Sequence, residues 1–260
     1  MTTEKFASES GHYYTRAGEP AYEVPNAARG GMRPTRITDA KKLLLVPSVT
    51  TLLSTLAKPG LESWKIKQAV LAALTLPRSD GELEDAWLRR VMEDAKSEGR
   101  NAAQEGTNIH ASIEHYLLSG VMSLRYEHHV VGAIECVEKL TGTPVRTGFK
   151  PEKSFSHPLG FGGKCDLHNE QWVIDFKGKE FSAADTDALM AYDDHDMQLA
   201  AYRLGLNVPR ARCAIVYVSR NHPGVAHAVE VPEARLVRGL RMFLPLIDHW
   251  KAKNDYDPSF

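Results

Sequence analysis

The stretch FGGKCDLH (residues 161–168), followed after an Asn-Glu turn by QWVIDFK (residues 171–177), decides the fold of this protein. Both halves have the period-two pattern that is typical of short β-strands. Because the connection between them is short, we expect the two strands to be antiparallel neighbours. Side chains alternate across a strand, so Asp175 and Lys177 should lie on the face opposite Phe176.

The regions on both sides of this stretch predict a sheet flanked by helices. A strand over residues 152–157 precedes it and makes three strands in succession. Upstream, apolar residues recur at helical spacing, and downstream the spacing changes from helix to strand and back. These patterns predict a mixed α/β (α+β) fold with a central mixed β-sheet flanked by helices and a helical N-terminal half. The expected downstream elements are a helix over 194–206, strands over 212–219 and 226–231, and a helix over 232–253.

The chain divides into an irregular N-terminal segment, residues 1–46, and a single domain, residues 47–260. The first segment is rich in Gly, Pro and polar residues, which indicates loops and short strands. The domain comprises a helical part (47–142), a catalytic sheet core (150–231) and the C-terminal helix (232–253). The helices expected in the helical part span 48–57, with Ser48 as N-cap, and 59–76, 82–98, 101–118 and 126–140.

Composition and charge limit the class of protein. Of the 260 residues, 43% are hydrophobic and 25% are charged, as in ordinary globular proteins. A net charge of -1 excludes a uniformly cationic nucleic-acid binder but allows local basic stretches. Cys136, Cys165 and Cys213 are too few and too scattered for a disulfide framework or a cysteine-rich metal site, which indicates a reducing compartment. Without a membrane-length apolar stretch or a targeting segment, we expect a soluble, cytoplasmic protein.

Two carboxylates on the central strands are candidates for a metal site. Asp166 lies near the end of its strand, and the antiparallel turn should bring it close to Asp175. Two carboxylates without a thiol cluster suit a hard divalent ion, Mg²⁺ or Mn²⁺. Lys177 beside such an ion would stabilise an attacking hydroxide or the charge on a phosphorane. Taken alone, Asp-x-Lys is more simply read as a surface ion pair on an edge strand.

Two helices carry further polar residues at helical spacing. His110 and Glu114 are four residues apart and lie together beside an apolar stripe. An imidazole is a suitable third ligand beside two carboxylates, although a lone histidine at a helix start is more often packed or capped. Gln198 and Tyr202 also share one helix face. They are either part of an amphipathic helix or hydrogen-bonding groups directed at a substrate or at Lys177.

A set of motifs in a fixed order resembles a nuclease family. The set is His110, Asp166, Asp175-x-Lys177 and Gln198-x-x-x-Tyr202. It resembles the PD-(D/E)XK nuclease superfamily of the RecB type over about residues 101–205, which implies a restriction-endonuclease-like core. The stretch PSVTTLL (residues 47–53) and Trp64-Lys65 are similar to one branch of that superfamily. The branch includes the mitochondrial genome maintenance exonuclease and related phage and bacterial exonucleases.

The resemblance implies a metal-dependent exonuclease that hydrolyses phosphodiester bonds from DNA ends, in recombination, repair or replication-end processing. It implies one or two Mg²⁺ or Mn²⁺ ions, and DNA with free ends, preferably single-stranded, as the partner. Some RecB-type relatives hold an iron–sulfur cluster with four cysteines, and because this chain lacks them we expect no cluster. The implied metal ligands are His110, Asp166, Asp175 and the carbonyl of Phe176. Lys177 would act with the two aspartates in catalysis, and Gln198 and Tyr202 would hold the active-site strand or the DNA. Glu114 and Glu152 would have either a direct role or a supporting one.

Two basic segments are candidates for a DNA track. Residues 29–42 and 203–220 are rich in Arg and Lys, and Tyr13, Tyr14 or Trp64 would stack on bases. An equally good reading is that these segments are exposed loops that keep the chain in solution.

Other interpretations of the same residues remain open at this stage. The acidic run over residues 185–196 is expected to be a solvated loop rather than a second metal site. The alternative functions are a structure-specific or restriction-like endonuclease and a non-catalytic DNA-binding module on the same fold. The intact Asp166, Asp175 and Lys177 argue against the non-catalytic module. An exonuclease is favoured over an endonuclease by analogy alone.

Overall fold

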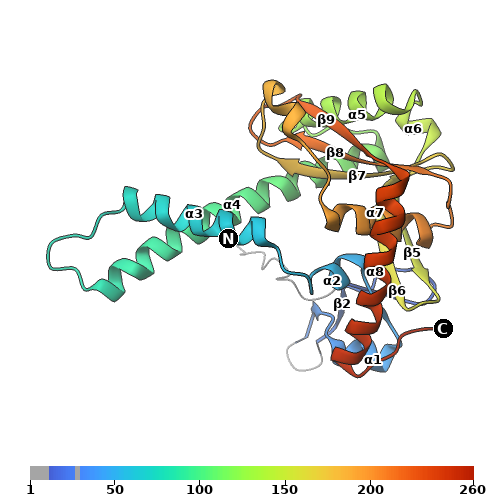
Figure 1. Ribbon diagram of the computed structural model, residues 1–260, viewed down its shortest axis with the longest axis horizontal. Coiled ribbons are helices and arrows are strands. Elements are labelled where there is room, and N and C mark those ends of the chain that lie inside the picture. The colour runs from blue at the N-terminus through green and yellow to red at the C-terminus, as the bar shows by residue number, and fades with distance from the viewer. Residues whose placement is uncertain (1–11, 27–29) are drawn as a thin grey trace.

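The fold is built on a five-stranded sheet whose strands β5 to β9 lie side by side in sequence order (Figure 1). The computed structural model describes residues 12–26 and 30–260. Strand β6 is antiparallel to both of its neighbours, β5 and β7, β8 runs parallel to β7, and β9 is antiparallel to β8. The strands are β5 (Lys150–His157), β6 (Phe161–His168), β7 (Trp172–Lys179), β8 (Arg212–Ser219) and β9 (Ala226–Val231).

The parallel pair β7–β8 requires a crossover connection, and helix α7 (Asp193–Gly205) supplies it. The short 3-10 helix η1 (Ala183–Ala188) precedes α7 in the same connection. After β9, helix α8 (Glu233–Asn254) packs along α7. Gly239 allows this close approach, because a Cβ added there would lie 2.7 Å from the backbone carbonyl of Asp196.

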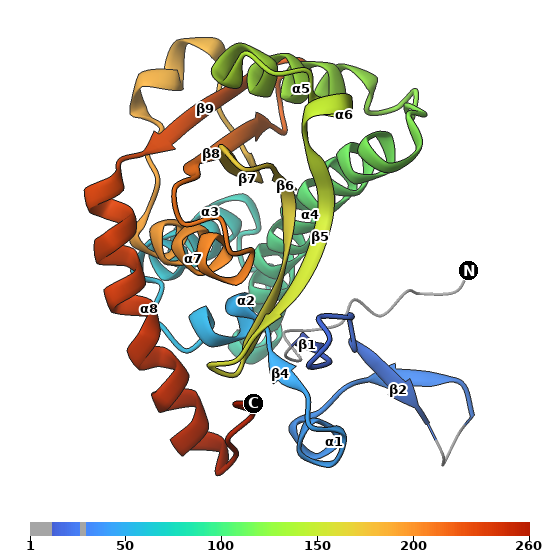
Figure 2. The same cartoon turned by 90° about the vertical axis from the view of Figure 1, so that its right-hand side faces the viewer.

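Helices cover both faces of the sheet, and each face has its own apolar cluster (Figure 2). Helices α7, α8 and α2 (Val49–Leu53) cover one face, while α4 (Glu84–Ser119) and α5 (Glu127–Thr141) cover the other. Val173 belongs to the first cluster and Phe176 to the second. Successive residues of β7 therefore face opposite sides, as the alternation in the sequence predicts. The short helix α6 (Val145–Gly148) leads from α5 into β5.

Helix α3 (Pro59–Thr75) and the first half of α4 form a hairpin that projects away from the sheet (Figure 1). The expectation of two separate helices over 82–98 and 101–118 is wrong, because α4 is continuous. Gly99, at the expected break, lies within α4, and a Cβ added there would be 3.5 Å from the ring of Trp64. The glycine therefore lies in ordinary contact with α3 in the interior of α4 and does not end the helix.

The N-terminal segment contains short paired elements. The expectation of loops and short strands is confirmed for its strands, but helix α1 (Ile37–Leu43) was not predicted. With seven residues, α1 is too short to show a clear apolar period, and contacts around Asp39 hold its first turn. Ser48 caps α2 as predicted, but α2 ends at Leu53 and not at the predicted residue 57. The paired strands are β1 (Tyr13–Tyr14) with β4 (Val46–Pro47) and β2 (Glu23–Pro25) with β3 (Met32–Pro34).

This architecture confirms the predicted fold class. Helices, three antiparallel strands, a helix and a strand parallel to the third make a restriction-endonuclease-like core, preceded by a helical N-terminal half. Cys165 and Cys213 are fully buried thiols. Within the residues that the structure describes, no helix is both long enough and apolar enough to cross a membrane.

Candidate active site

Strands β6 and β7 separate at the point where the two predicted carboxylates lie. The two strands pair only at Leu167–Ile174 and His168–Val173, so Asp166 and Asp175 are the next opposed positions, just beyond the last pair. There the Oδ2 atom of Asp166 accepts a hydrogen bond of 2.7 Å from the backbone N–H of Phe176. Both aspartates are buried, with 6% and 2% of their surface exposed. The fork between the strands therefore brings the two carboxylates together, as the register predicted.

Helix α4 brings His110 to this fork. Its Nε2 atom is 3.1 Å from Oδ2 of Asp166. Two glycines allow the helix to come so close to β7, because a Cβ added to Gly178 would lie 3.2 Å from the Cα of Gly106. Burial lowers the pKa of His110, but the facing carboxylates, Asp166 above all, outweigh burial and raise it to about 9. The same contact lowers the pKa of Asp166 against the effect of its burial.

Helix α7 holds the other carboxylate through one amide. The Gln198 Nε2 group donates to Oδ1 of Asp175 at 2.8 Å and to the Tyr202 hydroxyl at 2.9 Å, while its Oε1 accepts from Lys177 at 3.2 Å. The Lys177 ammonium lies 2.7 Å from Oδ2 of Asp175. Burial raises the pKa of Asp175 to about 6, although Lys177 opposes this. Gln198 and Tyr202 therefore support the active-site strand from the face opposite α4.

Glu114 and Glu152 lie beside the same site and share one cation. The Lys164 ammonium is 3.0 Å from Glu114 and 2.5 Å from Glu152. Glu152 lies opposite Asp166 in the β5–β6 register and has a φ of 51°, which is unfavourable for a residue with a side chain. Burial raises its pKa to about 7. The sequence analysis did not predict Lys164, although its position two residues before Asp166 in an alternating strand was the available signal.

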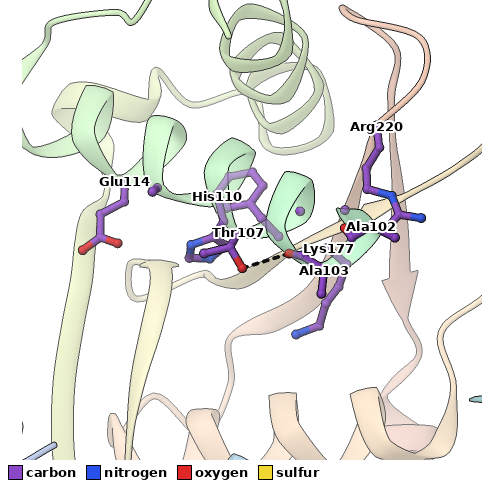
Figure 3. Close-up of a pocket in the computed structure, with 11 residues that line it drawn as sticks. Ala102, Ala103, Thr107, His110, Glu114, Lys177 and Arg220 are labelled. Carbon is purple, nitrogen blue, oxygen red and sulfur yellow. Dashed lines mark hydrogen bonds between the residues drawn. The ribbon is translucent and has the colours of Figure 1, made fainter. Parts of the chain in front are cut away.

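A cavity of about 440 Å³ opens beside these groups, between α4 and the end of β7. Figure 3 shows His110, Thr107 and Glu114 on α4, with Lys177 and Arg220 across from the helix. The Arg220 guanidinium donates to the carbonyl of Ala102 at 2.7 Å, so it is fixed against α4. Arg220 was predicted only as part of the basic segment 203–220, not as a residue of this pocket. It follows β8 directly.

The side chains at this site have the chemistry that suits a hard divalent ion, although no three potential ligands of the described residues are grouped closely enough to hold one as they stand. The carboxylates of Asp166 and Asp175 and the imidazole of His110 are ligands that Mg²⁺ and Mn²⁺ accept. Oδ2 of Asp175 is buried beside the Lys177 ammonium at 2.7 Å, and Oε2 of Glu152 is buried beside the Lys164 ammonium at 2.5 Å. Buried carboxylates are paired with cations or coordinate metals, and a divalent ion would share these oxygen atoms with the two ammonium groups. The carbonyl of Phe176 remains a predicted ligand.

Two predicted features of the DNA track do not agree with the structure. Tyr13 and Tyr14 have only 4% and 2% of their surface exposed, so they cannot stack on bases. Trp64 is 36% exposed, with its ring near Gly99. The segment 203–220 is not a free basic track either, because three of its four arginines are paired with carboxylates. The pairs are Arg203 with Glu233, Arg212 with Glu230 and Arg220 with Glu180. Arg29, in the other basic segment, lies outside the described residues.

The acidic run over residues 185–196 is not entirely a solvated loop. Asp196 has 0% of its surface exposed and binds Arg235 at 2.8 Å. Asp193 is exposed and contacts Arg238 at 2.5 Å. The prediction failed for Asp196 because the charge run enters α7, whose first turn packs against α8.

No protein-family model matches the chain, and no curated protein matches it. Among solved structures, it is similar to a chain from Eubacterium rectale that is provisionally classed as an exonuclease, with 13% identity, 58% of this chain and 68% of that chain covered, and a TM-score of 0.42. An alkaline exonuclease from Laribacter hongkongensis is 15% identical, and the similarity covers 75% of this chain and 95% of that chain with a TM-score of 0.37. A phage-related exonuclease from Haemophilus somnus 129PT is 13% identical, and the similarity covers 69% of this chain and 91% of that chain with a TM-score of 0.31.

Proposed function

We propose that this protein is a Mg²⁺- or Mn²⁺-dependent DNA exonuclease that hydrolyses phosphodiester bonds from DNA ends. The observation that carries the proposal is the convergence of Asp166, Asp175, His110 and Lys177 at the fork between β6 and β7. Two buried carboxylates at one point are costly, even with Lys177 and His110 beside them. They are therefore more readily explained by metal-dependent chemistry than by a role in stability.

Each residue at the fork has a definite task in this proposal. Asp166, Asp175 and His110 would hold the ion, together with the carbonyl of Phe176. When bound, the ion lowers the pKa of water and neutralises charge on the phosphate. Lys177 would place its ammonium next to the attacking water and the phosphate oxygens, since it already lies 2.7 Å from Asp175. Because its Nζ is also bonded to Gln198, the lysine is held in place before substrate arrives.

In this proposal DNA approaches the fork beside the α3–α4 hairpin. The pocket lies against residues 102–114 of α4, and α3 begins near α7, where Lys58 is 3.8 Å from Asp194. The preference for ends over internal sites rests on the resemblance of the motifs to end-processing enzymes. Recombination, repair and replication-end processing are the pathways that need such an activity.

An end-labelled digestion tests the proposal. Linear single- and double-stranded DNA, labelled at either end, would be incubated with Mg²⁺ or Mn²⁺ beside covalently closed circles. We expect labelled mononucleotides or short products from linear DNA and intact circles. Cleavage of the circles would instead identify an endonuclease, and absence of turnover on every DNA form would identify a binding module.

Two variants assign the activity to the fork. Asp175→Asn should abolish digestion, because it removes a ligand charge at the buried site. Asp187→Asn, an exposed position in the same acidic region, is the matched control and should retain full activity. Digestion by a contaminant-free Asp175→Asn preparation at the wild-type rate would rule out the site.

A further inference from the structure

The α3–α4 hairpin exposes more apolar surface than a monomer needs. In the described part of the chain, nine of the 21 exposed large hydrophobic side chains lie between Leu61 and Met92. This stretch points away from the sheet and its core (Figure 1). Contiguous exposed apolar surface usually marks a binding site. The hairpin therefore has a surface that a partner can cover.

One face of the hairpin has a distinctive charge pattern, and we call it the outer face of α4. It is hollowed, and all its residues are exposed. Leu88 and Met92 form its centre, with 42% and 46% of their surface exposed. The full set that lines the hollow is Asp85, Leu88, Arg89, Met92, Glu93 and Lys96.

The charges on this face are complementary to the same face of a second copy that is related to the first by a two-fold rotation. When a second α4 lies antiparallel, with the two-fold axis near residues 90 and 91, Asp85 of one copy faces Lys96 of the other. In the same arrangement Arg89 faces Glu93, and the apolar centres meet each other. An isologous contact requires this self-complementarity, since each residue must suit its counterpart in the reverse direction. The six residues satisfy it around a single axis.

The same charges argue against other partners. Two acidic and two basic side chains give the face no net charge, so it does not match a uniformly negative nucleic acid. Glu93 also contacts Arg100 at 2.6 Å, but both side chains are exposed. A surface ion pair of this kind is weak and readily exchanged for an intermolecular one.

We propose that the outer face of α4 binds the outer face of a second copy of this chain and forms a two-fold dimer. Because α4 is continuous, the same rigid helix would carry the dimer contact at its first half and His110 at its second. The distance from the two-fold axis to His110 would be about 29 Å along the helix, from ~1.5 Å per residue. The dimer would thus hold two nuclease sites apart and leave both open.

The strength of the contact follows from its size. One helix face is small beside the ~1,600 Å² of a standard interface. We therefore expect a dimer whose population rises with protein concentration. The proposal does not depend on the nuclease function, because mass and not cleavage reports on it.

Charge reversal provides the test, with mass measured by sedimentation equilibrium over a concentration series. The wild type should shift from one copy to two. Arg89→Glu and Glu93→Arg should each weaken the dimer at least tenfold, because both place like charges opposite each other. An equimolar mixture of the two variants should restore dimers. In the mixed dimer one copy carries acidic side chains at positions 89 and 93 and the other carries basic ones, so both contacts again join opposite charges.

A matched control separates this contact from a general effect of charge. Arg241→Glu makes the same charge change on the exposed side of α8, away from the outer face of α4. This variant should dimerise like the wild type. Helical content measured by circular dichroism should be equal in all variants, because the changed side chains are exposed.

Two results would overturn the proposal. A wild type that remains monomeric at all concentrations would leave this face to a different partner. Dimers that survive in both single variants would place the contact elsewhere on the molecule.

Discussion

Among single residues, Gln198 links more of the site than any other side chain described above. One amide contacts Asp175, Lys177 and Tyr202. Supporting hydrogen bonds of this kind typically account for about ten- to hundredfold of activity at metal sites. We predict that Gln198→Leu lowers kcat about ten- to hundredfold, because the carboxylate and the ammonium lose their fixed orientation. Tyr202→Phe removes only the outer contact and should cost less.

The measurement must distinguish an effect of Gln198 on the orientation of the site residues from an effect on the stability of the fold. Steady-state digestion of labelled single strands gives kcat and KM, and thermal unfolding gives stability. We expect the loss in kcat with KM nearly unchanged and a cooperative unfolding transition. A proportional loss of both folded protein and activity would show that Gln198 is structural alone.

Also at the residue scale, Asp39 gives the structure a defined response to acid. The hydrogen bonds from Arg33 lower the pKa of Asp39 from 3.8 to about 2. A depressed pKa means that the ionised carboxylate stabilises the fold above about pH 4, and that this contribution is lost as the pH falls towards about 2. We predict that Asp39→Asn lowers the urea midpoint at pH 7 and that the difference from wild type shrinks below pH 4. Asp187→Asn, at an exposed position of η1, is the control and should show no such convergence.

At the scale of elements, the close packing of α8 on α7 supports the site from behind. Gly239 has no room for a methyl group, since its Cβ would lie 2.7 Å from the Asp196 backbone. We predict that Gly239→Ala destabilises the protein by about 1–3 kcal/mol, as overpacking does elsewhere. It should also lower activity, because α7 carries Gln198. Gly60→Ala, where nothing lies within 4 Å of the added Cβ, is the control and should be neutral in urea unfolding.

The elements also show what a sequence can and cannot predict. The strands over 161–168, 212–219 and 226–231 were placed without error, because each is a short segment rich in apolar residues with turn residues near its ends. Asp166 and Asp175 were correctly brought together, since register follows from a short turn. The break expected between residues 98 and 101 was wrong, because α4 continues through Gly99.

Other features of the site depend on contacts between residues far apart in the sequence, which a local sequence pattern does not predict. The pairing of Lys164 with Glu114 joins residues 50 positions apart, and only the folded chain brings them together. The same holds for Arg220, which reaches Ala102 from across 118 positions. Asp196 was expected to be exposed but is buried, and its ion-pair partner, Arg235, lies on α8. Tertiary contacts of this kind decide burial and cannot be read from charge runs.

At the scale of the whole molecule, the fold and the proposed metal site are separable. Two apolar clusters hold the sheet from both faces, and neither includes Asp166 or Asp175. We therefore predict that chelation by EDTA abolishes digestion and leaves a folded protein. Adding Mn²⁺ at about a hundred times its Kd should then stabilise the fold by about 2.7 kcal/mol, which for a chain of this size raises the Tm by roughly 5–10 °C.

Asp175→Asn distinguishes this linkage from general effects of salt. Without metal the variant should be at least as stable as the wild type at pH 7, because burial raises the pKa of Asp175 to about 6 even beside Lys177, so the ionised carboxylate disfavours the fold. Mn²⁺ should no longer raise its Tm, whereas the Asp187→Asn control should respond like the wild type. Differential scanning calorimetry with and without Mn²⁺ measures both quantities. An undiminished shift in Asp175→Asn would mean that the ion binds elsewhere, because a stabilising ion must lose affinity when one of its ligands is removed.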